Sequence, residues 1–345
     1  MSGDATLARL IQHEHEGWDD PVVCRAVFGA TAPEVIAAQI QAWLLDGLGA
    51  RAVRARFYRV SVGCVAGVDL DDGRAVVVKA QRSGRSATYF ESCFAVRRHL
   101  ANEGFPCPRP LGEPLRRGDV WITFEELVDG GELGDAHDPS TRSALAASLA
   151  QLVTLARPLA ASVALGRAWY TAIPDDRLWP RPHSPLFDFE RTAEGAAWID
   201  DIARRARAAR SEPRGELVIG HFDWRVEHLR FEDGRVVASY DWDSLHVELE
   251  PVLVGANAHA FTADWQREDL AQAPSVEEIL AFLDDYERAR GHAFTPDERA
   301  LARASCVYSL AYTARCGHAL RPHDESHAGD FRPLLRRAAE ALLPR

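Results

Sequence analysis

Residues 217–245 read LVIGHFDWRVEHLRFEDGRVVASYDWDSL, and both the architecture and the chemistry can be predicted outward from this stretch. It contains two apolar runs, and a short acidic cluster follows each of them. Asp223 ends the triplet His-Phe-Asp after the first run, and Asp241 follows the second run 18 residues later. Asp233-Gly234 lies between them, and Asp-Gly between apolar runs is a strong signal for a β-hairpin. The stretch therefore predicts a strand, an acidic loop, a hairpin and a second acidic loop.

The chain before residue 127 reads as a small β-rich unit. Asp72-Gly73 predicts another hairpin, because it separates the runs CVAGVDL and RAVVVKAQ, and a third strand-like run, VRARFYRVSVG, precedes them. A helix is expected over 87–102, where Gly104 and two prolines then stop it. Residues 119–128, DVWITFEELV, read as one further buried strand, and the glycine-rich segment DGGELGD follows as a flexible joint.

Beyond the joint the chain reads as mostly helical. Ser140 can cap the run TRSALAASLAQLVTLA, and the pairs Ser275–Glu278 and Thr295–Glu298 have the spacing of capping boxes. We therefore expect two domains: residues 1–126, with a helical N-terminal extension and a β-rich lobe, and residues 127–345, a helical lobe.

Composition and charge exclude several classes of protein. Apolar residues make up 47% and charged residues 26% of the 345 residues, which is ordinary for a soluble globular chain. Residues 1–126 carry 15 basic and 16 acidic side chains, whereas residues 127–345 carry 25 and 35, a net charge of −10. This argues against nucleic acid as the partner, because phosphate backbones require a basic face. It is compatible with a cationic small-molecule substrate, and equally with an acidic surface that only keeps the protein soluble.

Six cysteines are scattered, at positions 24, 64, 93, 107, 306 and 316, without a Cys-x-x-Cys pair. This pattern indicates reduced thiols and, with an N-terminus that lacks the pattern of a secretory signal, a cytoplasmic protein. No run approaches the roughly 18 consecutive apolar residues of a membrane span, so we expect no membrane partner. In HEHEGW, residues 13–18, two histidines at i, i+2 fit no common zinc spacing, so we expect surface polar side chains.

With these parts in this order, the sequence resembles the aminoglycoside phosphotransferase family, which shares the protein-kinase-like fold. The family pattern is His-Gly-Asp-x-x-x-x-Asn, a hairpin, and an apolar strand that ends in Asp-Trp-Glu or similar; here HFDWRVEH and DWDS stand in these places. The resemblance implies an α+β, protein-kinase-like bilobal fold. Its small antiparallel β-rich N-lobe (1–126) would bind nucleotide, and its larger, mainly helical C-lobe (127–345) would carry the catalytic loop and the substrate-binding region.

Lys79, in RAVVVKAQR, is the only lysine among 40 basic side chains. On a central strand its compact ammonium can reach the α- and β-phosphates of a nucleotide, which the planar fork of arginine does not replace cleanly. The resemblance implies this role for Lys79, with Glu91 of the following helix as its partner. The alternatives are a stray lysine on a solvated strand end, and a surface glutamate favoured by the helix dipole.

Asp223 would be the catalytic-loop aspartate, which accepts or orients the proton of the substrate hydroxyl. Arg225 would lie near the γ-phosphate, or is a surface arginine. Asp241 would bind the metal ion that bridges the nucleotide phosphates, because hard Mg²⁺ prefers carboxylate oxygens. Asp243 would add a water-mediated metal contact, or faces solvent. His221 is expected to be a structural histidine that hydrogen-bonds the backbone near the loop.

His228 stands where the family has a metal-binding asparagine. An imidazole is a softer ligand than an amide oxygen and suits Mn²⁺ or Zn²⁺ better than Mg²⁺. Three alternatives follow: His228 binds metal through nitrogen, it acts through a water, or the second metal site is lost.

The remaining nucleotide contacts have weaker signals. Gly63, in VSVGCVAG, could let backbone N–H groups approach phosphates, although ordinary strand glycines at 63 and 67 explain it almost as well. The backbone of Glu126 and Val128 would hold the purine edge, which leaves adenine and guanine undistinguished. The sequence contains neither a P-loop nor a Gly-x-Gly-x-x-Gly fingerprint.

We therefore expect an enzyme that transfers the γ-phosphate of ATP or GTP, with Mg²⁺ or Mn²⁺, to a hydroxyl of a small molecule. The resemblance implies inactivation of an antibiotic, an aminoglycoside or another sugar-containing drug such as a nucleoside antibiotic. The alternatives are a kinase of a small metabolite, such as an amino alcohol or a sugar, and a degenerate nucleotide-binding pseudokinase. Substrate contacts are expected from residues 165–215 and 255–325, and the sequence carries no signal for the oligomeric state.

Overall fold

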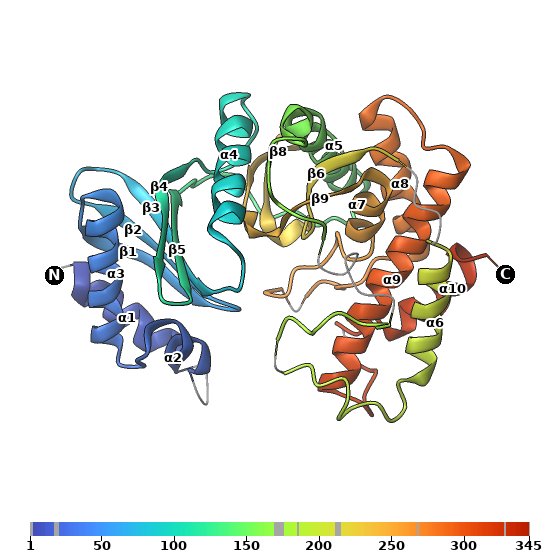
Figure 1. The fold of residues 1–345 in the computed structure, drawn as a ribbon, viewed down its shortest axis with the longest axis horizontal. Helices are drawn as coiled ribbons and strands as arrows, with labels where there is room; N and C mark the ends of the chain where they lie inside the picture. Colours follow the sequence, from blue (N-terminus) through green and yellow to red (C-terminus); the bar gives the residue numbers. More distant parts are fainter. Residues whose placement is uncertain are drawn as a thin grey trace. The chain divides into compact units, whose positions relative to one another are not determined.

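The structure is a computed structural model that describes residues 3–16, 21–168, 176–184, 186–210, 215–267, 269–327 and 329–344. The chain divides into two compact units, which are treated separately below (Figure 1). The first unit contains Met1–Asn102 and Cys107–Asp129, and the second contains Glu103–Pro106 and Gly130–Arg345. Gly17 and Trp18 of the HEHEGW motif lie outside the described residues, as do 169–175, 185, 211–214 and 268 of the expected substrate regions.

The first unit is built on a five-stranded antiparallel sheet of order β1-β2-β3-β5-β4. Its described elements are α1 (Gly3–His15), α2 (Val22–Phe28), α3 (Pro33–Leu48), β1 (Ala52–Val60), β2 (Cys64–Leu70), β3 (Ala75–Arg82), α4 (Ala87–Asn102), β4 (Pro110–Arg117) and β5 (Val120–Glu126). The hairpin expected at Asp72-Gly73 is confirmed, because β2 pairs with β3 and Gly73 adopts a positive φ of 88°.

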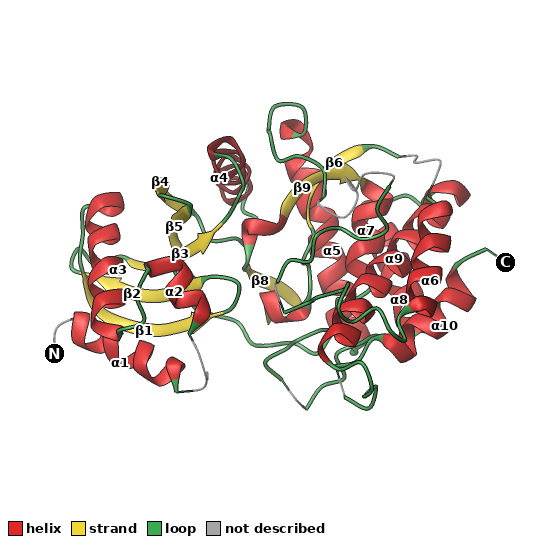
Figure 2. Ribbon diagram, turned by 60° about the horizontal axis from the view of Figure 1, so that its bottom comes forward, coloured by secondary structure: helices red, strands yellow, loops and turns green. Residues whose placement is uncertain are grey.

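Helices cover both faces of this sheet (Figures 1 and 2). Val76, Val78 and Ala80 of β3 pack in one core with the apolar side chains of α1, α2 and α3. The alternate residues of β3, which include Lys79, face the other side, because side chains alternate along a strand. That side carries α4, whose Phe90 stacks on Trp121 of β5 with ring centroids 4.5 Å apart. Lys79 therefore lies on the α4 face, and the N-terminal helices support the sheet from behind it.

The second unit combines two small antiparallel sheets with helices (Figure 2). Its described elements are α5 (Pro139–Ala156), α6 (Ala197–Ala208), β6 (Leu217–His221), β7 (Leu229–Glu232), β8 (Arg235–Ser239), β9 (Leu245–Leu249), α7 (Glu250–Ala258), α8 (Val276–Arg290), α9 (Pro296–Leu320), α10 (Arg332–Leu342), and short 3₁₀ helices at Arg157–Leu159, Val226–His228 and Trp242–Ser244. β6 pairs with β9 and β7 with β8, and Asp233 and Gly234 both adopt positive φ in the hairpin between β7 and β8. An antiparallel sheet unit followed by a mainly helical one confirms the expected fold class.

The helix caps of the second unit match the sequence in two cases of three. Both expected capping boxes are confirmed, at Ser275 before α8 and at Thr295 before α9. The expected cap of α5 at Ser140 is wrong, because the Asp138 carboxylate accepts the Thr141 N–H at 2.9 Å. Pro139 then occupies the first helical turn, where a missing N–H costs nothing.

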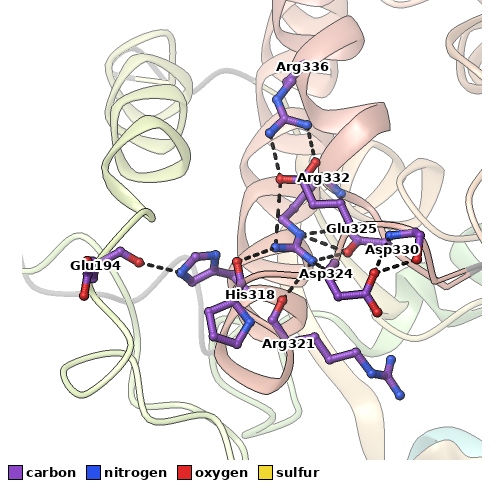
Figure 3. Close-up of polar contacts among 10 residues, drawn as sticks. Glu194, His318, Arg321, Asp324, Glu325, Asp330, Arg332 and Arg336 are labelled. Atoms are coloured by element: carbon purple, nitrogen blue, oxygen red, sulfur yellow. Dashed lines mark hydrogen bonds and ion pairs between the residues drawn. The ribbon is translucent and has the colours of Figure 1, made fainter.

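The connection between α9 and α10 is organised around the buried side chain of Arg332 (Figure 3). Its guanidinium donates to the carbonyl oxygen of Arg321 at 3.1 Å and to the carboxylate of Asp330 at 2.9 Å. His318 of α9 lies with Nε2 2.9 Å from the carbonyl oxygen of Glu194, which precedes α6. These contacts fix the end of α9 against α10 and against the segment before α6, and of these residues Glu194, His318 and Arg321 lie within the expected substrate regions.

None of the helices in the described ranges is by itself long and apolar enough to cross a membrane. α2 and α3 together reach that length and composition, with a bend of 43° between them. All six cysteines are free thiols, as expected, and all six are buried.

Candidate functional site

Asp223, His228 and Asp241 converge in the second unit. Asp223 follows β6, His228 ends the 3₁₀ helix Val226–His228, and Asp241 follows β8. One ligand atom from each residue lies within 4.8 Å of the others, a convergence that no other set of His, Cys, Asp or Glu shows in the described part of the chain. His228 is buried, whereas the Asp223 and Asp241 side chains are 32% and 41% exposed, so the carboxylates stay reachable from solvent.

The imidazole of His228 lies between the two carboxylates. Its Nε2 is 3.7 Å from Oδ2 of Asp223, and its Nδ1 is 3.7 Å from Oδ2 of Asp241. Both separations exceed a direct hydrogen bond. Two carboxylates and an imidazole form a mixed oxygen and nitrogen donor set, which fits a divalent cation and suits Mn²⁺ or Zn²⁺ at least as well as Mg²⁺.

A local backbone turn places Asp241 beside His228. Tyr240 donates its N–H to the carbonyl oxygen of His228 at 2.9 Å, which ties the end of β8 to the 3₁₀ helix. Asp241 itself adopts φ 62° and ψ 48°, a left-handed conformation that aspartate tolerates better than most side chains. Such strained residues persist where the surrounding structure holds them, and they cluster at functional sites.

The loop that carries Asp223 is held by His221 and Asn257. The Asp223 N–H donates to Nδ1 of His221 at 3.1 Å, which confirms the structural role predicted for that histidine. Asn257 of α7 donates to the His221 carbonyl oxygen at 2.9 Å, and its own Oδ1 accepts the N–H of Trp224 at 2.9 Å. No local sequence pattern points to Asn257, because it is far along the chain from the loop that it clamps.

Arg225 is bound to two carboxylates. One of its Nη atoms donates to Asp223, and its Nε donates to Glu227 at 2.9 Å. Glu227 in turn accepts from Nε2 of Gln266 at 3.1 Å. Although the Asp223 side chain is partly exposed, the protein atoms packed around its carboxylate desolvate it and raise its pKa above the ordinary value, and Arg225 opposes that shift. Arg225 is therefore an internal partner of Asp223 and not a surface arginine, and its expected contact with the γ-phosphate stays a prediction.

In the first unit, Lys79 lies against Glu125. Its Nζ is 3.4 Å from Oε1 of Glu125, and Arg97 of α4 donates to the other oxygen of the same carboxylate at 2.6 Å. Glu125 is buried, which by itself would raise its pKa, but Lys79 and Arg97 outweigh burial and the pKa is lowered. Glu125 is therefore a carboxylate that stays charged and holds two cations, one from a neighbouring strand and one from the helix.

The expected pairing of Lys79 with Glu91 is wrong. Glu91 lies on α4, but its side chain is exposed, on the outward stripe of the helix that also contains Thr88 and Ala95. Residues three and four apart share one face of a helix, so this stripe points away from the sheet. Arg97 occupies the inward position instead, and the carboxylate within this unit that meets Lys79 comes from β5.

The remaining residues expected to contact the nucleotide or the metal are Gly63, Glu126, Val128 and Asp243. Gly63 lies in the turn between β1 and β2, where a Cβ would come within 2.7 Å of the Ala80 carbonyl oxygen, so close packing against β3 explains this glycine. The N–H of Glu126 donates to the carbonyl oxygen of Arg109 at 2.9 Å, and Val128 follows the end of β5. Asp243 lies in the 3₁₀ helix Trp242–Ser244, half-buried, and is not one of the three residues that converge. The roles of Gly63, Glu126, Val128 and Asp243 stay predictions.

Comparison with known proteins identifies one sequence family. Residues 67–249 match the sequence profile of the phosphotransferase enzyme family, and this range is more than half of the chain. It begins in β2 and ends in β9, so it contains Lys79, Glu125 and the three converging residues. A search of curated proteins finds no match in sequence.

Among the solved structures similar in fold to this one are three whose names describe kinases or a kinase family protein. A microcompartment-associated aminopropanol kinase has a TM-score of 0.58 and 14% identity, covering 88% of this chain and 93% of that one. A choline/ethanolamine kinase family protein from Mesorhizobium loti has a TM-score of 0.54 and 14% identity, covering 88% and 94%. The amicoumacin kinase hAmiN, in complex with AMP-PNP, Ca²⁺ and Ami, has a TM-score of 0.53 and 11% identity, covering 84% and 89%. At these identities the similarity shows a shared fold.

Proposed function

Because the chain belongs to the phosphotransferase enzyme family, we propose that it transfers the γ-phosphate of ATP or GTP to a hydroxyl group of a small molecule, and that this molecule is an antibiotic. The drug would be an aminoglycoside or another sugar-containing compound. The observation that carries the proposal is the convergence of Asp223, His228 and Asp241 within 4.8 Å.

Asp241 and His228 would hold the divalent cation, Mg²⁺ or Mn²⁺. Hard cations prefer carboxylate oxygen, and the imidazole extends the choice toward softer metals. When bound, this ion supplies positive charge to the nucleotide phosphates. His228 would act through one ring nitrogen, which leaves the other directed at a carboxylate. Asp243 would contribute through a water.

Asp223 would accept the proton of the acceptor hydroxyl. Its raised pKa makes it a better proton acceptor than a fully solvated aspartate, and one of its oxygens is already occupied by Arg225. Arg225 would therefore fix the orientation of the Asp223 carboxylate. It would also stabilise the negative charge of that carboxylate before the proton is transferred to it. The hydrogen bond from the Asp223 N–H to His221 fixes the backbone of the same residue.

Lys79 would neutralise the α- and β-phosphates of the nucleotide. Glu125 holds this ammonium in place, as the αC glutamate does in protein kinases, although here the carboxylate comes from a strand. The backbone of Glu126 and Val128 would meet the purine. Gly63 would lie beside the phosphates.

A second candidate is a kinase of an amino alcohol or another small cationic metabolite. It is compatible with the charge of residues 127–345, which carry 35 acidic and 25 basic side chains. Such a surface attracts cations over long range, and an aminoglycoside and an amino alcohol share that charge. Charge therefore supports a cationic acceptor without choosing between the two classes.

A nucleotide-consumption assay tests these proposals. The protein would be incubated with ATP or GTP, with Mg²⁺ or Mn²⁺, and with a panel of aminoglycosides, nucleoside antibiotics and amino alcohols, and phosphorylated products would be identified by mass spectrometry. Asp223→Asn serves as the matched control, since it should bind nucleotide but transfer almost no phosphate. For a cationic acceptor, kcat/KM should fall as salt shortens the screening length to about 10 Å and below.

The outcomes separate the candidates. Phosphorylation of an antibiotic supports the main proposal, and phosphorylation of amino alcohols alone supports the second. A flat salt profile would remove the argument from charge. Nucleotide binding without transfer to any acceptor, with either metal, would instead identify a pseudokinase.

A further inference from the structure

Four side chains of the first unit form a buried sulfur cluster, defined here as His15, Cys24, Tyr58 and Cys64. The two sulfur atoms are 3.8 Å apart, although the residues lie 40 positions apart in the sequence. Nε2 of His15 lies 3.3 Å from the Cys24 sulfur, and the hydroxyl of Tyr58 lies 3.4 Å from the same atom. Cys24 belongs to α2, and Cys64 is the first residue of β2.

We propose that Cys24 and Cys64 form an oxidisable dithiol, which a hydroperoxide converts into a disulfide with His15 as the proton acceptor for Cys24. The contact of His15 with Cys24 also corrects the expectation that the HEHEGW motif is purely a surface feature. His13 is exposed as expected, but His15 is half-buried and turned toward a thiol.

The surroundings distinguish Cys24 from the other cysteines. The Cys64 thiol and the Tyr58 hydroxyl can donate hydrogen bonds to its sulfur, and His15 can donate one once it has taken the proton, so the pKa of Cys24 lies below its ordinary value despite burial. Burial raises the pKa of Cys107 and of Cys316 to about 12. Thiolate is the reactive form of cysteine, so Cys24 is the expected nucleophile and Cys64, whose pKa is raised by its contact with Cys24 and by burial, is the expected resolving thiol.

The chemistry balances in two steps. His15 takes the thiol proton, and the Cys24 thiolate attacks one peroxide oxygen; the O–O bond breaks, Cys24 becomes a sulfenic acid, and the leaving hydroxide takes the proton to form water. The Cys64 sulfur then attacks the Cys24 sulfur, the S–O bond breaks, and the hydroxide leaves with the Cys64 proton as a second water. Two thiols lose two electrons, and one hydroperoxide gains them. A disulfide requires the two sulfur atoms, which are 3.8 Å apart, to approach to about 2 Å.

The product would join the N-terminal helices covalently to the sheet. α2 would be fastened to the start of β2, immediately after the turn that contains Gly63. This cross-link closes a long loop of the chain, so the oxidised protein should unfold at a higher temperature than the reduced one.

Peptide mapping tests the proposal on the intact protein. After treatment with hydrogen peroxide, alkylation of free thiols and digestion with trypsin, residues 10–25 and 60–74 each form a peptide with one cysteine. We expect these two peptides to be recovered as one linked species that has lost two hydrogens, and to separate again after dithiothreitol. Cys93 and Cys107, in other peptides, should stay alkylated and serve as internal references.

Matched variants test the roles. His15→Gln should slow the linkage by about tenfold, whereas His13→Gln, on the same helix but exposed, should not change it. In Cys64→Ser, dimedone should label Cys24, because no thiol resolves the sulfenic acid. If both cysteines of the peroxide-treated wild-type protein are fully alkylated, the dithiol is overturned. A linkage rate in His15→Gln equal to that of wild type would overturn the role of His15 as proton acceptor. Dimedone labelling of Cys64 in Cys24→Ser, with Cys24 unlabelled in Cys64→Ser, would reverse the assignment of the nucleophile.

Discussion

Lys79 and Glu125 lie one diagonal step apart on adjacent strands, with Nζ 3.4 Å from Oε1. In the register of β3 and β5, Lys79 is opposite Thr123 and Glu125 is opposite Val77, so both side chains are on the same face of the sheet. Diagonal neighbours of this kind are within reach of long side chains. The only lysine of the chain is thus fixed by the sheet itself, and Arg97 shares its counter-charge.

Lys79→Arg should lower turnover by about 100-fold or more while the fold stays intact. A planar guanidinium is larger than the ammonium and presents its donors in a fork, so it cannot keep both the Glu125 contact and the phosphate position. Steady-state kinetics with circular dichroism as the folding check would measure this. Near-normal turnover would show that phosphate positioning does not require the lysine.

Glu125→Gln should destabilise the first unit by about 3 kcal/mol, because it removes the buried negative charge that the Arg97 guanidinium and the Lys79 ammonium both contact. Urea unfolding would measure the change. Glu91→Gln is the matched control on the exposed stripe of α4 and should stay within about 0.5 kcal/mol of wild type. Equal effects of the two substitutions would contradict the assignment of Glu125.

Glu227→Gln should lower kcat by about tenfold with little change in the KM for nucleotide. The Glu227 carboxylate accepts a hydrogen bond from Nε of Arg225. Loss of this carboxylate frees the guanidinium to move away from Asp223. Glu227→Asp should restore part of the rate, and Glu232→Gln, an exposed position on β7, should have no effect. A rise in KM alone would assign Glu227 to nucleotide binding instead.

His228→Asn should shift the metal preference from Mn²⁺ toward Mg²⁺, because an amide oxygen replaces an imidazole nitrogen beside Asp223 and Asp241. The ratio of activities with the two metals, measured for both proteins, would show the shift. Activity that is lost with both metals, at an unchanged metal affinity, would place His228 outside the metal site.

His137 should make the second unit more stable at mildly acidic pH. Burial favours its neutral form, but the Ala271 carbonyl at 2.9 Å and the Glu278 carboxylate at 2.8 Å outweigh this and raise its pKa above 6.5. A raised histidine pKa contributes stability that is complete below the unfolded value and is lost as pH rises through the folded one. The free energy of unfolding, compared between wild type and His137→Gln, should therefore differ more at about pH 6 than at about pH 8. A difference that does not vary with pH would exclude the ionised pair.

Short-range signals in the sequence predict some parts of this protein well. Asp-Gly turns locate both hairpins, because few other dipeptides accept their backbone angles, and the helix over 87–102 has the expected bounds. The spacing of Asp223 and Asp241 predicts that the two carboxylates lie close together, because the chain between them forms two strands and a hairpin of fixed length.

Other parts of the structure depend on contacts between residues that are far apart in the sequence, which no short stretch of sequence contains. Glu91 and Arg97 lie on different faces of one helix, and only its packing against the sheet shows which face is inward. Asn257 and Gln266 support the loop around Asp223 from distant segments, through the His221 carbonyl oxygen and the Glu227 carboxylate. β4 escapes prediction because Pro110, Gly112 and Pro114 suggest a loop, and such residues are tolerated in a strand mainly at the edge of a sheet.

The two edge strands of the five-stranded sheet, β1 and β4, are the places where a second molecule could pair with it. An open edge strand offers unpaired N–H and C=O groups to another chain. On β4 the prolines and the irregular register between Leu111 and Leu115 interrupt that row of groups. On β1, side chains of α1 accept the outward N–H groups instead: Thr6 accepts from Ala55 at 3.2 Å, and Glu14 accepts from Val60 at 3.1 Å. The N-terminal helix thus caps an aggregation-prone edge, and a truncation that removes it would expose a strand ready to pair with a second molecule.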